Sequence, residues 1–92
     1  MLTLEDCIEM SDLTPDEVEA IAEHEHTDLI LAAELGAYLV HSEEGQVRIH
    51  RMILDDIAHA QRRGDSSHAA KLKLVLSHFV EEHGDLEHGD ND

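Results

Sequence analysis

Residues 28–42, DLILAAELGAYLVHS, are apolar almost throughout. A helix advances about 100° per residue, so a helix over this stretch would carry apolar side chains on nearly every side. Such a helix is stable only when neighbouring elements cover it. The stretch is too short to cross a bilayer, which takes about 20 residues, and Glu34 and His41 interrupt it. We therefore expect a buried central helix against which the rest of the chain packs.

The rest of the chain contains start and stop signals for four more helices. In TPDE, Thr14 can cap a helix that begins at Pro15, and Glu17 completes a capping box. Gly64 is suited to end a helix, and short connections imply antiparallel neighbours. The sequence thus predicts an all-α fold, a small orthogonal or antiparallel bundle of about five helices. A short first helix is expected to begin near residue 3. The other four are expected over residues 15–26, 28–42, 43–63 and 66–83, and a single kinked helix over 15–42 is the alternative.

Residues 4–21, LEDCIEMSDLTPDEVEAI, resemble the helix-turn-helix unit of bacterial repressors. The resemblance rests on the spacing of the apolar residues and on Asp12, which stands at the turn where that family prefers glycine. It implies two packed helices, of which the second would contact DNA. That second helix has no Lys or Arg, and its acidic residues are Asp16, Glu17, Glu19, Glu23 and Glu25. We therefore expect the helical hairpin without DNA binding.

The chain of 92 residues is long enough for one domain with a modest core. We place a single helical domain at residues 1–83. The sequence EHGD occurs at 82–85 and again at 87–90, in a region with almost no apolar residue. A disordered acidic tail is therefore expected over residues 84–92.

The chain has 22 acidic and 6 basic side chains, which give a formal net charge of −16. This charge repels the phosphate backbone of nucleic acids, and the scarcity of aromatic residues leaves little surface for base stacking. Direct binding of nucleic acid is therefore not expected. A similar acidic composition is found in proteins of salt-loving organisms, in which the charge reflects habitat and not function.

Cys7 is the only cysteine, so the chain cannot form an internal disulfide. The N-terminal sequence MLTLEDC lacks the basic and apolar regions of a signal peptide. These features favour a cytoplasmic protein that does not enter a membrane. Cys7 shares its side of the first helix with Leu4 and Ile8, which favours a packing role over a nucleophilic one.

Glu34, Tyr38 and His41 form a narrow polar stripe on the apolar helix of residues 28–42. Polar groups on a buried helix need hydrogen-bond partners. We therefore expect these three side chains to join a structural polar network at a helix or subunit interface, in preference to a catalytic site.

Two carboxylate–histidine pairs stand one helical turn apart, at Glu23-x-x-His26 and Asp56-x-x-His59. This spacing resembles that of ferritin-like di-iron proteins, although Asp56 replaces a glutamate of that pattern. The resemblance implies a metal site within a helical bundle. In a chain so rich in acids and histidines, solvated pairs are favoured, and His59 is expected to face outward. The full set of candidate ligands for iron, zinc or nickel is Glu23, His26, Glu34, His41, Asp56 and His59.

Three further histidines, His50, His68 and His83, fall on the apolar faces of the last two predicted helices. Burial disfavours the charged form of histidine. We expect buried or boundary histidines that are hydrogen-bonded to a carbonyl or carboxylate, with a metal or pH-sensing role as the alternative.

No sequence motif identifies a reaction, since the chain lacks a phosphate-binding glycine loop, GxSxG, HExxH and a paired CxxC. We therefore expect no catalytic residues, no enzymatic activity and no cofactor beyond the metal alternative. Surplus apolar residues such as Met52 and Leu74 favour a non-catalytic interaction or regulatory module that associates with itself, as a homodimer, or with another protein. Two alternatives stay open: a transition-metal-binding protein, and an acidic mimic of DNA that binds a basic partner.

Overall fold

The structure, a computed structural model, describes residues 3–83, which contain five α-helices and no strand. The helices are α1 Leu4–Met10, α2 Pro15–Glu25, α3 Leu29–Val40, α4 Glu43–Arg63 and α5 Ser66–Glu82. The predicted all-α bundle is confirmed. Residues 15–42 form two helices, as expected, and not the single kinked helix that was the alternative. The expected disordered tail, residues 84–92, lies outside the described residues.

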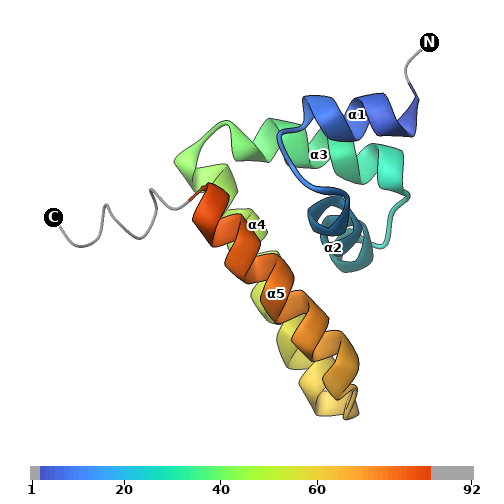
Figure 1. Ribbon diagram of the computed structural model, residues 1–92, viewed down its shortest axis with the longest axis vertical. Helices are drawn as coiled ribbons and strands as arrows, with labels where there is room; N and C mark the ends of the chain where they lie inside the picture. The colour runs from blue at the N-terminus through green and yellow to red at the C-terminus, as the bar shows by residue number, and fades with distance from the viewer. Residues whose placement is uncertain (1–2, 84–92) are drawn as a thin grey trace, which may run out of the picture.

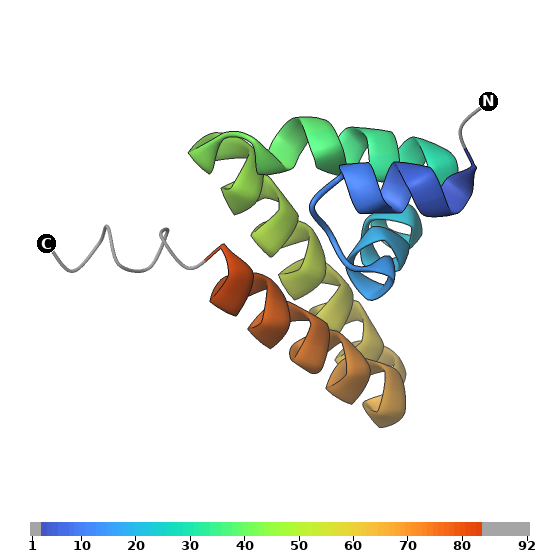
Figure 2. The same ribbon diagram turned by 45° about the horizontal axis from the view of Figure 1, so that its top comes forward.

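The helices form two groups (Figure 1, Figure 2). α4 and α5 lie side by side as a long antiparallel hairpin, while α1, α2 and α3 gather at one side of it. α3 leads into α4 at a sharp corner, and α1 packs on α3. The Cα atoms extend over 40 × 37 × 16 Å, so the molecule is flat. A flat arrangement of so few helices cannot cover every helix on all sides.

Each described helix begins at a side chain that accepts a hydrogen bond from the backbone of its first turn. In α2, the Glu17 N–H donates to Thr14 Oγ1 at 3.2 Å, and the Thr14 N–H donates to Glu17 Oε1 at 2.8 Å. The predicted capping box is therefore confirmed, and it fixes where α2 begins. The N-cap residues of the five helices are Thr3, Thr14, Asp28, Ser42 and Asp65.

Three connections place a residue in the left-handed region of the backbone, at Asp12 (φ 63°), His26 (φ 55°) and Gly64 (φ 77°). Asp12 lies in the turn between α1 and α2, at the position where helix-turn-helix units prefer glycine. Glycine adopts this conformation at little cost, and aspartate is among the side chains that tolerate it. Two helices joined by this turn are present as expected, but they barely contact each other, and α1 packs on α3 instead. Gly64 ends α4 as predicted.

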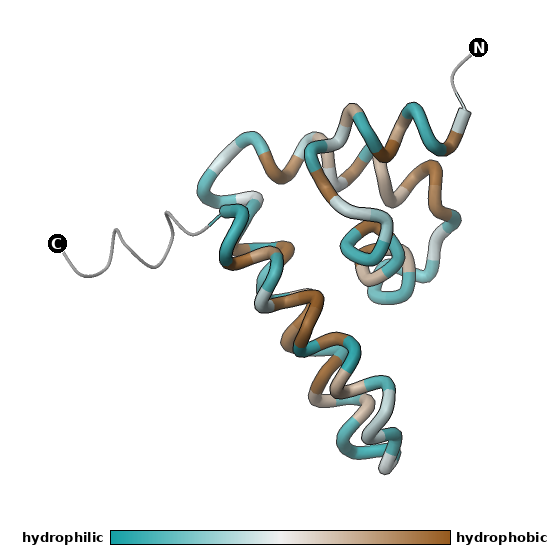
Figure 3. The backbone as a smooth tube through the Cα atoms, in the orientation of Figure 1, coloured by the Kyte–Doolittle hydropathy of each residue, from teal (hydrophilic) through white to brown (hydrophobic). Residues whose placement is uncertain are grey.

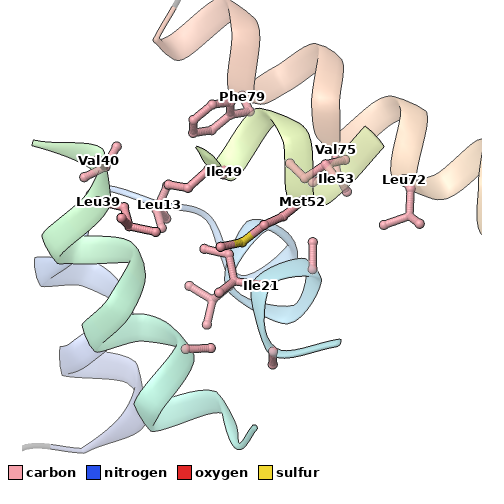
Figure 4. Packing of buried hydrophobic residues seen from close by; sticks show 14 of the residues in the cluster. Leu13, Ile21, Leu39, Val40, Ile49, Met52, Ile53, Leu72, Val75 and Phe79 are labelled. Atoms are coloured by element: carbon pink, nitrogen blue, oxygen red, sulfur yellow. The ribbon is translucent and has the colours of Figure 1, made fainter. Parts of the chain in front are cut away.

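The hydrophobic core lies where the α4–α5 hairpin meets α2, α3 and the turn before α2 (Figure 4). Phe79 of α5 and Ile49 and Ile53 of α4 are almost completely buried, and Ile21 of α2 packs with them. Figure 3 shows hydrophobic residues where α4 and α5 face each other and hydrophilic residues at the tip of their hairpin. The inner face of α4 follows the period of a helix packed on one side, and its buried members are Ile49, Ile53, Ile57 and Ala60, whereas Leu54 is exposed.

Met52 and Leu74 were both expected to be surplus to the hydrophobic core, but they differ in burial. Met52 is 4% exposed, because it packs in the core between α4 and the N-terminal helices (Figure 4). Leu74 is 74% exposed on the outer side of α5. Of these two residues, only Leu74 is surplus to the core.

Candidate functional site

The outer side of α3 is left uncovered by the other described helices. Helices α1, α2 and α4 pack on the remaining sides of α3, so its buried residues are Ala32, Ala33, Gly36, Leu39 and Val40. On the outer side, Ile30 is 47% exposed, Leu31 53% and Tyr38 78%. The expectation that this helix is buried all round is wrong, because the flat arrangement supplies no helix for this side.

Glu34, Tyr38 and His41 share this outer side, and all three side chains are exposed. Among residues 3–83 no helix lies over this stripe, so water can solvate its polar groups. A contact with a second molecule stays a prediction. We call Ile30, Leu31, Glu34, Tyr38 and His41 the α3 face.

Acidic side chains border the α3 face. Asp28 caps the start of α3, and Glu43 and Glu44 follow its end in the first turn of α4. The neighbouring helix α1 exposes Glu5 and Glu9.

Basic residues are absent from this part of the chain. The first Lys or Arg in the sequence is Arg48, and all 6 basic residues lie in α4 and α5. This separation of charge is visible in the sequence, but a count over the whole chain conceals it.

A second candidate site is a pocket of 260 Å³ between the end of α2 and the second half of α4. It brings together both carboxylate–histidine pairs that the sequence suggested as metal ligands. His59 is exposed, as expected. The other two candidate ligands, Glu34 and His41, belong to the α3 face and do not line this pocket. The residues that line it are Glu23, His24, His26, Asp56, His59 and Arg63.

Asp56 is the one buried side chain among those that line the pocket, at 6% exposure. Its Oδ2 atom is buried and has no hydrogen-bond partner within residues 3–83. Burial raises the pKa of the Asp56 carboxyl and the charge of Glu23 raises it further, while His24 and His59 act in the opposite direction. Asp56 is therefore an incompletely satisfied carboxylate at the centre of an ionisable cluster.

His24 is held by carboxylates through both ring nitrogens. Nδ1 lies 2.9 Å from Glu25 Oε2, and Nε2 lies 3.4 Å from Asp55 Oδ2. Burial of the ring lowers the pKa of His24, but its hydrogen bonds to Glu25 and Asp55 raise it by more, so the net shift is upward. Sequence reasoning missed His24, because it considered only carboxylates and histidines one turn apart.

His50, His68 and His83, which were expected to be buried or at a boundary, are half-buried. His68 has a carboxylate partner, since its Nε2 lies 2.8 and 2.9 Å from the two carboxylate oxygens of Glu23. The His83 ring packs against Phe79 at a centroid distance of 4.8 Å, and its buried Nε2 has no partner in the described chain. His50 is half-buried on α4.

Glu17 is a second buried carboxylate that sequence reasoning missed. Its side chain is 1% exposed, and Oε2 has no hydrogen-bond partner within residues 3–83. Burial raises the pKa of Glu17, opposed by its hydrogen bonds with Thr14 and by the charges of His78 and His83. Glu17 stands one turn before Ile21, on the apolar side of α2, and this spacing was the signal that could have found it.

Comparison of the chain with protein-family models, curated proteins and solved structures finds no match. In the described part of the chain, no helix has the combined length and apolar character of a membrane span. Within the same residues, no three His, Cys, Asp or Glu side chains are already arranged to hold a metal ion. The functional argument therefore rests on the chemistry of the α3 face and of the pocket.

Proposed function

We propose that this protein is a non-catalytic binding module that holds a basic amphipathic helix of a partner protein on the α3 face. The observation that carries the proposal is the exposure of Ile30, Leu31 and Tyr38 on a helix bordered by carboxylates. Apolar surface in contact with water is unfavourable by about 25 cal/mol per Å², and a partner that covers it recovers this free energy.

The acidic border determines the chemistry of the partner. Carboxylates at Asp28, Glu43 and Glu44 attract Lys and Arg residues that flank the apolar stripe of an amphipathic helix, and this attraction also increases the association rate. Leu31 and Tyr38 lie two helical turns apart, the spacing at which a docked helix is commonly contacted. The α3 face thus suits a cationic helix.

A second copy of this chain is a less suitable occupant. An isologous contact through the α3 face would bring two acidic borders together, and neither copy offers a Lys or Arg before Arg48 to compensate them. For this reason we favour a basic partner over the homodimer that the sequence suggested.

The test uses a synthetic helical peptide with Leu on one face and Lys on the other, without Tyr or Trp. Tyr38 is the only tyrosine and the chain has no tryptophan, so intrinsic fluorescence reports on the α3 face directly. We expect Leu31→Ala to weaken peptide binding about tenfold, because truncation of a central apolar anchor costs more than 1 kcal/mol. Leu74→Ala is the matched control, since Leu74 is also an exposed leucine but lies on α5.

Two results would overturn the proposal. One is equal peptide affinity for the wild-type chain and Leu31→Ala, which would mean that the peptide binds acidic surface without using the α3 face. The other is a peptide-free dimer, seen by sedimentation, that Tyr38→Asp dissociates. That result would assign the α3 face to a second copy.

A further inference from the structure

We infer that the pocket between α2 and α4 binds one divalent transition-metal ion, represented by zinc, through Glu23, His24, Asp56 and His59. Two carboxylates and two imidazoles suit borderline divalent ions, and zinc commonly takes four such ligands. This site is separate from the α3 face and does not depend on the proposed function.

The unpartnered oxygen of Asp56 is the observation that points to a ligand. A buried carboxylate oxygen without a partner is costly. Asp56 lines the pocket, and its carboxyl interacts electrostatically with Glu23, His24 and His59. A bound cation would satisfy Oδ2 and offset the repulsion between Asp56 and Glu23.

The four donors come from two helices that pack against each other. Asp56 and His59 stand one turn apart on α4, while Glu23 and His24 lie in the last turn of α2, which packs against α4. The C-terminal end of a helix carries partial negative charge, which also favours a cation there.

The Glu25 carboxylate can hold His24 in the tautomer that a metal ligand requires. Its Nδ1 lies 2.9 Å from Glu25 Oε2, so a proton on Nδ1 can be donated to that carboxylate. Nε2 is then the nitrogen with a free lone pair for a metal ion. A carboxylate that accepts from the second ring nitrogen is the usual support of a metal-bound histidine.

Binding requires the ligands to exchange contacts that they already make. The Glu23 carboxylate would leave His68, whose Nε2 lies 2.8 and 2.9 Å from its two oxygens. His24 Nε2 would leave Asp55 Oδ2 at 3.4 Å, and the His59 ring would leave Arg62, whose Nη2 donates to Nδ1 at 3.2 Å. Exposed contacts of this kind contribute little to stability. Arg63 also lines the pocket, but its guanidinium lies 3.8 Å from the Asp65 carboxylate, which offsets its charge.

The test is calorimetric titration of zinc chloride into the full chain, prepared without a histidine tag and freed of metal with chelator. We expect one equivalent of zinc to bind. Asp56→Asn and His59→Ala should each weaken binding at least tenfold, because each removes a ligand. Both variants should fold, which circular dichroism checks, since His59 is exposed and asparagine retains the shape of Asp56 while removing its charge.

Two controls separate this site from other histidines. His41→Ala removes an exposed histidine of the α3 face, and His88→Ala removes one from the EHGD repeat. Both should bind zinc like the wild-type chain. The inference is overturned if zinc does not bind, if Asp56→Asn and His59→Ala retain full affinity, or if His88→Ala alone abolishes binding. Cobalt, whose visible absorption reports its coordination, provides a second readout in the same variants.

Discussion

Gly45→Ala tests the corner between α3 and α4, which holds the α3 face in place. Gly45 is the third residue of α4 and is buried. A Cβ atom at this position would overlap the carbonyl oxygen of Leu39, and it would stand 2.5 Å and 2.6 Å from the Leu39 carbonyl carbon and Cα. Ordinary contacts between carbon atoms are about 3.5–4.0 Å long. The two backbone segments would therefore have to separate by about 1 Å.

The expected destabilisation follows from two opposing effects. Alanine in place of glycine stabilises a helix by about 1 kcal/mol, because glycine loses more conformational freedom on folding. Overpacking typically costs about 1–3 kcal/mol, and backbone atoms cannot rotate away as a side chain can. We therefore place the clash at the upper end of this range and expect a net loss of about 2 kcal/mol, from a total of roughly 5–14 kcal/mol for a chain of this length.

Urea denaturation followed by circular dichroism measures this change, and Gly64→Ala is the control. Gly64 also lies in a connection between two helices, but a Cβ atom there would meet nothing within 4 Å. Its φ of 77° imposes the cost of a left-handed residue, about 1–2 kcal/mol. If Gly45→Ala is as stable as the wild-type chain, or loses less stability than Gly64→Ala, the close packing of this corner is refuted.

Two further predictions concern stability. The pKa values of Glu17, Asp56 and His24 are all raised in the folded chain, so folding favours their protonated forms, and the free energy of unfolding measured in EDTA should increase as the pH falls from 8 to 5. The stabilisation from His24 should be complete once the pH is below 6.5, the ordinary pKa of histidine, and the stabilisation from the two carboxyls should grow as the pH approaches 5. A decrease in the free energy of unfolding from pH 8 to pH 5 would contradict the raised pKa values. Thr14→Ala removes the capping box of α2 and should cost about 1 kcal/mol in urea denaturation, whereas Ser77→Ala, at an exposed interior position of α5, should not be destabilising. An unchanged Thr14→Ala variant would mean that the cap does not stabilise the folded chain.

The helices could be predicted because their signals are local. The hydroxyl of Thr14 and the carboxylate of Glu17 interact across one turn, and Gly64 ends α4 through its own backbone conformation. Neither effect depends on the rest of the fold. The inner face of α4 could also be predicted, because its apolar residues recur at the period of a helix that packs on one side only.

The candidate sites could not be predicted in full, because they depend on how the helices are arranged around one another. Leu31 and Tyr38 are exposed because none of the described helices covers that side of α3, and no local pattern reveals this. The pocket depends on the register of α2 against α4, which places Glu23 beside Asp56. Sequence spacing found both carboxylate–histidine pairs, but it gave no reason to prefer His24 over His26.

The arrangement of charges explains why the α3 face, and not the other side of the N-terminal helices, suits a cationic partner. On the side that meets the hairpin, carboxylates of α2 already have partners: Glu19 lies 3.8 Å from the Lys71 amine, and Glu23 contacts His68. Among residues 3–83, neither Glu43 nor Glu44 forms an ion pair. Uncompensated negative charge is therefore concentrated beside exposed apolar side chains. A helix that offers both lysines and leucines gains from both features at once, whereas a purely cationic or a purely apolar partner gains from one.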